Sequence, residues 1–212
     1  PRNSNPASGV KKLKERKRER ILAGGELADF ESKLVAAKSA GGKFAPYVNL
    51  IFILILTGCR RDEWRAGRWE WLDLAAFTYN LPDSKTGAKS VTLSLDAVEF
   101  LRAHARELGH ADIPKHGFIF PARRNRAKPL PWNWRLWNQI RREFGLEGFR
   151  VHDIRHTVGS LAHAGGLSQK QVANLLGHKD MKTSARYIHD PDKHESANTA
   201  SAAIKAAKAG KP

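Results

Sequence analysis

The chain contains very little sulfur and no long apolar segment. It has one cysteine, Cys59, and one methionine in 212 residues. A single cysteine excludes an internal disulfide and any zinc site built from several cysteines. The longest apolar run, from Val48 to Leu56, is much too short to span a bilayer, and the polar, basic N-terminus does not resemble a signal peptide. A reducing cytoplasm is the simplest compartment for such a chain, and we expect no membrane partner.

Acidic residues are also scarce. The sequence has 21 Asp and Glu against 37 Lys and Arg, which gives a formal net charge of +16 and a pI near 10.3. This excess favours a polyanionic partner, and nucleic acid is preferred because no amphipathic membrane anchor or lipidation motif occurs. A hydrophobic content of 41% with six tryptophans predicts a packed core rather than disorder.

Composition divides the chain into three parts. Residues 1–20 begin with Pro, Ser, Asn and Gly and continue into a basic run, which is typical of an interdomain linker. Residues 21–195 form the expected globular domain, and residues 196–212 form an Ala- and Lys-rich C-terminal tail with one more helix. The basic run either contacts DNA phosphates in a complex or is a solvated tail.

Local patterns predict a mainly helical α+β domain with a small antiparallel sheet. Thr78–Leu81 and Ser90–Leu95 are β-branched or alternating and flank the turn sequence DSKTG, so they predict a hairpin. A capping box, Ser168 with Gln171, begins a helix that runs to 176 before Gly177. Further helices are expected at residues 26–37, 47–56, 62–69, 97–108 and 132–144.

Two details of these helices can be predicted. Asp96 is expected to be the N-cap of the helix at 97–108, which Gly109 closes. In the helix at 132–144, Trp134, Trp137 and Ile140 are expected to share one face.

Three short motifs in a fixed order contain the groups that could carry chemistry: TGCRRDE, HDIRH and LLGHKDMKTSARY. A fourth segment, SKTG, lies between the first two. Together they supply two arginines, two histidines, a lysine, a tyrosine and a carboxylate. Guanidinium groups are planar forks that match the oxygens of a phosphate better than an ammonium point charge does. The set is therefore suited to binding and attacking a phosphodiester without a metal.

The order and spacing of these motifs resemble the catalytic domain of the tyrosine recombinases, the phage integrase family, across residues 57–187. The resemblance makes Tyr187 the nucleophile that forms a 3′-phosphotyrosyl link. It assigns transition-state stabilisation to two arginines and a histidine: Arg60, Arg155 and His178. It assigns proton acceptance, proton donation and arginine orientation in turn to His152, Lys85 and Glu63, with Lys89 as the alternative to Lys85.

Each assignment has a structural alternative. Arg60 could be an ordinary surface arginine, Glu63 a surface ion pair, and His178 a C-capping histidine. His152 and His156 have the spacing of a helical zinc-ligand pair, but Asp153 replaces the glutamate of the HExxH motif and no third ligand is obvious. We therefore expect no metal and no cofactor.

The resemblance also implies partners. These are double-stranded DNA, in the cytoplasm at the nucleoid, and a homotetramer on that DNA. It further implies an N-terminal clamp (core-binding) domain that is missing from this sequence. The tail after Tyr187 could dock on a neighbouring protomer or on its own domain.

Other functions remain open. They are a type IB topoisomerase-like enzyme, a catalytically silent DNA-binding or regulatory protein on the same fold, and a basic RNA-binding protein. Around the first arginine, Arg61, Trp64, Trp69 and Trp71 are bulkier or more charged than the resemblance leads us to expect.

Overall fold

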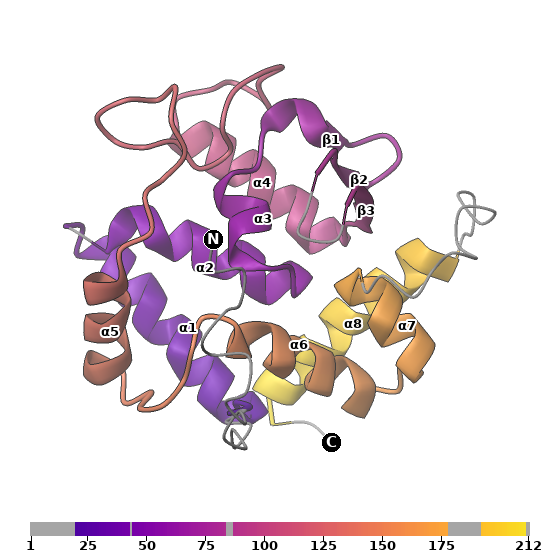
Figure 1. Cartoon of the computed structure of the whole chain (residues 1–212). Coiled ribbons are helices and arrows are strands. Elements are labelled where there is room, and N and C mark those ends of the chain that lie inside the picture. The colour runs from indigo at the N-terminus through magenta and orange to yellow at the C-terminus, as the bar shows by residue number, and fades with distance from the viewer. Residues whose placement is uncertain (1–19, 43, 84–86, 178–191, 211–212) are drawn as a thin grey trace, which may run out of the picture.

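The computed structural model describes residues 20–42, 44–83, 87–177 and 192–210 (Figure 1). It confirms a mainly helical α+β fold with a small antiparallel sheet. The helices are α1 (Gly24–Ser39), α2 (Ala45–Thr57), α3 (Arg61–Arg65), the 3-10 turn η1 (Trp69–Trp71), α4 (Leu95–Glu107), α5 (Trp134–Glu143), α6 (Asp153–Ala164), α7 (Gln169–Leu176) and α8 (Asp192–Lys208). The strands are β1 (Leu72–Asp73), β2 (Thr78–Leu81) and β3 (Lys89–Thr92).

The sheet has the order β1-β2-β3 and both pairings are antiparallel. The predicted hairpin is confirmed as β2 and β3, with Tyr79 opposite Val91 and Leu81 opposite Lys89. Tyr79, Leu81 and Val91 are buried, because alternate residues of a strand point to the same face of the sheet. Lys89 is therefore at the end of the hairpin that adjoins the turn sequence.

Helix α2 is the central helix of the core. It is apolar on almost every side, which is the pattern of a fully buried helix, and it contacts α1, α3, α4 and α6. Like every other helix in the described part of the chain, it is not long and apolar enough to cross a membrane. It ends at Thr57, so the residues that follow it emerge from the middle of the domain.

The expected N-cap of α4 is wrong by two residues. Ser94 is extended and its Oγ accepts the backbone N–H of Ala97 at 3.3 Å, so the helix begins at Leu95. Asp96 lies instead in the first turn, where its carboxylate accepts the Lys205 ammonium group at 2.6 Å and the Ser201 hydroxyl group. A side chain from a helix distant in sequence thus takes the carboxylate that the local pattern assigned to capping.

The expected apolar face of α5 is also partly wrong. Asn133 caps this helix through its side-chain oxygen, and the buried residues are Leu136, Trp137 and Ile140. Trp134 is 56% exposed. The helix begins at Trp134, so this side chain lies at the end of the helix rather than over the core.

Helix α8 packs on its own domain, against α6, α1 and α7 (Figure 1). It begins at Asp192, four residues before the expected tail. The approach to α6 is close enough that a Cβ atom at Gly165 would lie 2.1 Å from the Cβ of Ala203. The ion pair of Lys208 with Glu31, at 2.7 Å, joins the helix to α1.

Candidate active site

The site is built on the turn that ends α2. The Thr57 hydroxyl donates to the carbonyl of Ile53 at 2.6 Å and accepts the indole N–H of Trp64 at 2.9 Å. Gly58 then takes a left-handed conformation with φ of 61°. This turn ends α2, and α3 begins directly after Arg60.

Gly58 is also a point of close approach. A Cβ atom there would lie 2.6 Å from Leu176 of α7 and 3.0 Å from Val158 of α6. Its carbonyl accepts Nη1 of Arg155 at 2.9 Å. Only glycine fits both the positive φ and the packing, so the first motif is held against the helices of the second and third motifs at this residue.

Glu63 holds Arg60 through two groups. One carboxylate oxygen, Oε2, accepts the backbone N–H of Arg60 at 2.8 Å, and the other, Oε1, accepts its Nη1 at 3.1 Å. The Glu63 side chain is 6% exposed and that of Arg60 is 29% exposed. The carboxylate is therefore inside the domain, while the guanidinium group reaches partly into solvent.

Lys89 shares the same carboxylate. Its Nζ lies 2.7 Å from Oε1 of Glu63, and its side chain is 10% exposed. Burial on its own raises the pKa of Glu63, but the ion pair with Lys89, together with the hydrogen bonds of Arg60, outweighs burial and lowers this pKa below its ordinary value. The sequence named Lys89 only as an alternative to Lys85. Its one local signal is its place directly before the predicted strand Ser90–Leu95.

Arg155 of α6 is almost fully buried, with 4% exposure. Nη1 is bound to Gly58, whereas Nη2 is buried and has no hydrogen-bond partner among the described residues. Burial lowers the pKa of the guanidinium group, and the nearby charge of Arg60 acts in the same direction. Arg60 and Lys89 thus pair with the Glu63 carboxylate, and the charge of Arg155 interacts with both Arg60 and Glu63. We call these four residues, Arg60, Glu63, Lys89 and Arg155, the arginine–carboxylate cluster.

The two histidines of the second motif lie beside this cluster. His152 is the residue before α6, and its ring meets that of His156 edge to face, with centroids 5.1 Å apart. Partial burial lowers the pKa of His152, and the charges of His156, Arg155 and Arg60 lower it further. A neutral imidazole can accept a proton, which is the role that the resemblance gives to His152.

Three of the expected site residues, Lys85, His178 and Tyr187, lie outside the described part of the chain. The helix that precedes His178 ends as predicted, at Leu176, with Gly177 in the left-handed conformation. A Cβ atom at Gly177 would lie 3.2 Å from Nζ of Lys89, so the end of α7 adjoins the arginine–carboxylate cluster. Among the described residues, no three His, Cys, Asp or Glu side chains are grouped as metal ligands.

The bulky residues near the first arginine have structural roles. Trp64 and Trp69 are buried, and Trp64 stacks on Tyr79 with ring centroids 4.1 Å apart. The guanidinium group of Arg61 lies 4.9 Å from the ring centroid of Trp132 and 5.1 Å from that of Trp134. Arg61 is thus bound to aromatic rings and is separate from the cluster around Glu63.

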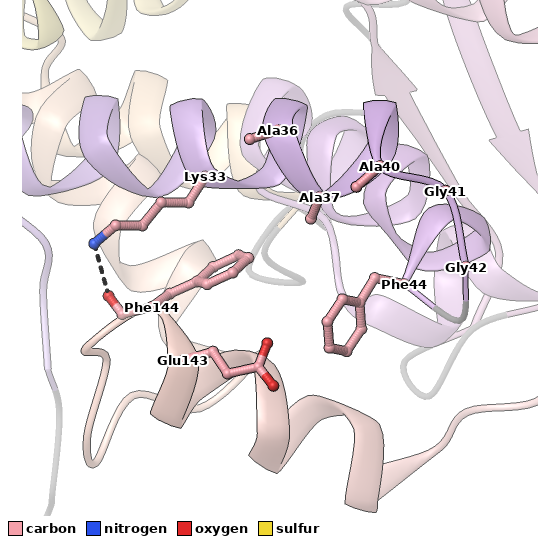
Figure 2. Close-up of a pocket in the computed structure, with 9 residues that line it drawn as sticks. All are labelled: Lys33, Ala36, Ala37, Ala40, Gly41, Gly42, Phe44, Glu143 and Phe144. Atoms are coloured by element: carbon pink, nitrogen blue, oxygen red, sulfur yellow. Dashed lines mark hydrogen bonds between the residues drawn. The ribbon is translucent and has the colours of Figure 1, made fainter.

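A hollow on the described surface lies away from the cluster. Figure 2 shows this space of about 630 Å³ between the end of α1 and the end of α5, and it shares no lining residue with the cluster. Lys33, its only lysine or arginine, donates to the carbonyl of Phe144 at 3.2 Å and pairs with Asp29 at 2.7 Å. A second hollow of about 540 Å³ lies along α5 and is lined by Arg135, Asn138, Gln139, Arg141 and Arg142.

A mainly helical domain that sets two arginines around a shared turn, with a carboxylate and a histidine beside them, is suited to binding a phosphate group. Comparison with known proteins identifies the class of protein. The pattern described as "Phage integrase family" matches residues 30–194. The chain belongs to the phage integrase family.

Similar proteins agree with this family. The chain is 32% identical over 143 residues to a shufflon-specific DNA recombinase of Escherichia coli, covering 66% of the chain and 34% of that protein. It is 25% identical over 173 residues to the tyrosine recombinase XerD of Bifidobacterium longum, covering 76% of the chain and 56% of that protein. The chain thus spans from about a third to just over half of these relatives.

Solved structures share the fold. One is a lambda integrase dimer bound to a COC′ core site, with a TM-score of 0.59 and 21% identity, covering 87% of this chain and 51% of that chain. Another is the integrase from mycobacterium phage Brujita, with a TM-score of 0.58 and 18% identity, covering 93% of this chain and 64% of that chain.

Proposed function

We propose that the chain is the catalytic domain of a site-specific DNA recombinase that cuts and rejoins DNA through a 3′-phosphotyrosyl intermediate. The observation that carries this proposal is the arginine–carboxylate cluster. Arg155 is buried, with an Nη2 that has no hydrogen-bond partner within the described ranges, and Arg60 is held by Glu63 with part of its guanidinium group in solvent. Two oriented guanidinium groups of this kind would bind the non-bridging oxygens of one phosphate.

The reaction needs two transfers at phosphorus. In the first, the Tyr187 oxygen attacks the scissile phosphate, the bond from phosphorus to O5′ breaks, and a 5′ hydroxyl leaves. His152 takes the phenol proton and Lys85 donates a proton to O5′. In the second, a 5′ hydroxyl from a partner strand attacks the phosphotyrosyl bond and releases Tyr187. The covalent link stores the energy of the phosphodiester bond, so the cycle requires neither ATP nor a metal ion.

In this proposal, the extra negative charge of the transition state is stabilised by three side chains, Arg60, Arg155 and His178. The lowered pKa of His152 supports its role, because it favours the neutral ring, which can accept a proton. The net charge of +16 and the arginines along α5 would bind the DNA backbone, so affinity should fall steeply with salt.

The natural assembly follows from the same proposal. It is a homotetramer on double-stranded DNA at the nucleoid, with residues 1–20 as a basic linker from an N-terminal clamp domain. Residues 21–195 would then be the catalytic unit and residues 196–212 its tail. The relatives, one of which is solved as a dimer on a core site, support DNA as the substrate.

Covalent trapping tests the proposal. The natural protein is incubated with fragments of its host genome, and the reaction is stopped with detergent. The Tyr187→Phe variant is treated in the same way. We expect a DNA-linked species in the wild type and none in the variant, although both bind the fragments. The control is Tyr47→Phe, which removes a hydroxyl that donates to the carbonyl of Pro131 at 2.9 Å and should leave linkage intact. A wild type that binds DNA but forms no link would favour the catalytically silent DNA-binding alternative. Relaxation of supercoils without strand exchange would favour the topoisomerase alternative.

A further inference from the structure

Lys89 is the one member of the arginine–carboxylate cluster to which the proposed reaction gives no role. Its side chain is 10% exposed, and its ammonium group lies 2.7 Å from Oε1 of Glu63. Burial of a lysine is costly unless the charge is paired, so a lysine kept at this position needs a reason.

The contacts of Lys89 join three segments that are far apart in sequence. Its own strand, β3, belongs to the hairpin. Its ammonium group meets Glu63 at the start of α3, and its side chain passes Gly177 at the end of α7, where a Cβ atom would lie 3.2 Å from Nζ and 3.4 Å from Cδ. The space beside Gly177 is thus filled by the lysine.

The pairing also bears on Arg60. Both Lys89 and Nη1 of Arg60 are bound to the same oxygen of Glu63, at 2.7 and 3.1 Å. One carboxylate carries a single negative charge and therefore cannot fully neutralise two cations. Arg60 therefore keeps a part of its charge for a phosphate, while its direction stays fixed by the carboxylate.

We propose that Lys89 is a positioning residue that fixes the Glu63 carboxylate and, through it, the Arg60 guanidinium group, while its side chain supports the turn at Gly177. This inference rests on the proposed recombinase function. Lys89 contacts no reacting atom in this account and is distinct from the proton donor assigned to Lys85.

Several charged or titratable groups face Glu63 and decide how the loss of Lys89 would act. They come from the turn before α3, from β2, β3 and α6: Cys59, Arg60, Tyr79, Lys89 and Arg155. Without the lysine, Arg60 is the one cation still paired with Glu63 among the described residues, so we expect the pKa of Glu63 to rise from its lowered value. Protonation of the carboxylate would then release Arg60.

The test compares four proteins: wild type, Lys89→Met, Glu63→Gln and the double variant. Single-turnover cleavage is measured on the duplex recovered by covalent trapping, resynthesised with a nick so that cleavage cannot reverse. We expect Lys89→Met to cleave between about tenfold and a hundredfold more slowly, as for a misplaced binding group. In the Glu63→Gln background the same change should have no further effect, because the carboxylate that Lys89 holds is gone.

Two further readouts separate positioning from other roles. A substrate with sulfur at the 5′ bridging position releases a thiolate that needs no proton, so it should not rescue Lys89→Met. The urea midpoint of Lys89→Met should fall below that of wild type at pH 7. The gap should narrow as the pH falls, because Glu63 should become protonated at a higher pH in the variant than in wild type, where its pKa is lowered. Lys38→Met is the matched control, because it breaks a 2.6 Å pair with Glu107 that includes no member of the cluster.

The outcomes are distinct. Rescue by sulfur would overturn the positioning role and make Lys89 the proton donor. If Lys89→Met cleaves at the wild-type rate, or if the effects of the two substitutions add up in the double variant, Lys89 is a packing residue without a positioning role. If Lys89→Met does not fold, the double variant, which has no unpaired carboxylate, is compared with Glu63→Gln, and unequal rates overturn the inference. A wild type that forms no covalent link at all contradicts the recombinase proposal itself.

Discussion

Replacement of Arg155 by methionine should separate stability from catalysis. Methionine keeps an unbranched side chain of similar reach but removes the guanidinium group. The lost hydrogen bond from Nη1 to the carbonyl of Gly58, 2.9 Å long, involves a charged donor and is worth about 1.5–3 kcal/mol. Against this loss stands the relief of a buried charge whose Nη2 has no partner in the described part of the chain. Such burial costs several kcal/mol even after relaxation.

These two terms are similar in size and opposite in sign. We therefore expect Arg155→Met to change the free energy of unfolding by less than about 2 kcal/mol. Ile154, the neighbour of Arg155 on α6 with 2% exposure, is the control, and Ile154→Ala should cost about 2–5 kcal/mol because it opens a cavity. Urea unfolding at pH 7 measures both variants.

The same variant should lose covalent DNA linkage, because a phosphate-binding group is gone. The combination of near-wild-type stability and lost linkage is the signature of a residue kept for function at a cost to the fold. A stability loss above about 4 kcal/mol would refute this reasoning, since it would make the guanidinium group a structural tie. Retained DNA linkage would contradict the role of Arg155 in binding the phosphate.

Two other predictions follow from the environment of the cluster. Trp64→Ala should lower the free energy of unfolding, measured by urea titration, by about 3–5 kcal/mol, because a fully buried ring stacked on Tyr79 and hydrogen-bonded to Thr57 is lost. Trp134→Ala is the control and should cost much less, because Trp134 is 56% exposed. His156→Asn removes a charge that lowers the pKa of His152, so an NMR titration should find this pKa raised towards about 6.5, with no change in a His163→Asn control. The pKa of His152 is lowered in the folded state, so the neutral ring contributes to stability above the unfolded pKa. This contribution is lost as the pH falls through the folded pKa, and the loss should be smaller in His156→Asn.

The sequence alone predicted much of the local structure near the site. Gly58 and Gly177 each end a helix in the left-handed conformation, which favours glycine, and so their positions could be recognised from the residue type. The capping box of α7 and the pairing of β2 with β3 were also predicted, from the residue types at a helix start and around a turn. These features depend on contacts between residues that are near one another in the sequence, within one helix end or one hairpin.

Predictions failed where a distant residue decided the outcome. Asp96 is a good N-cap by type, yet Lys205, more than a hundred positions away, binds it while Ser94 caps α4. Trp134 fits an apolar pattern, but the helix begins at that residue and its ring lies over Arg61. Periodicity describes one helix and contains no information about what packs on its ends.

The sequence by itself determined the family, because the order and spacing of Arg60, His152 and Arg155 are properties of the chain. Only the tertiary structure decided that Arg155 is buried against Gly58 and that Glu63 is shared by Arg60 and Lys89. The physical reason is that charge pairing and burial depend on distances between segments. Those distances are set by the packing of α2, α3, α6 and β3 together, and no single stretch of sequence specifies them.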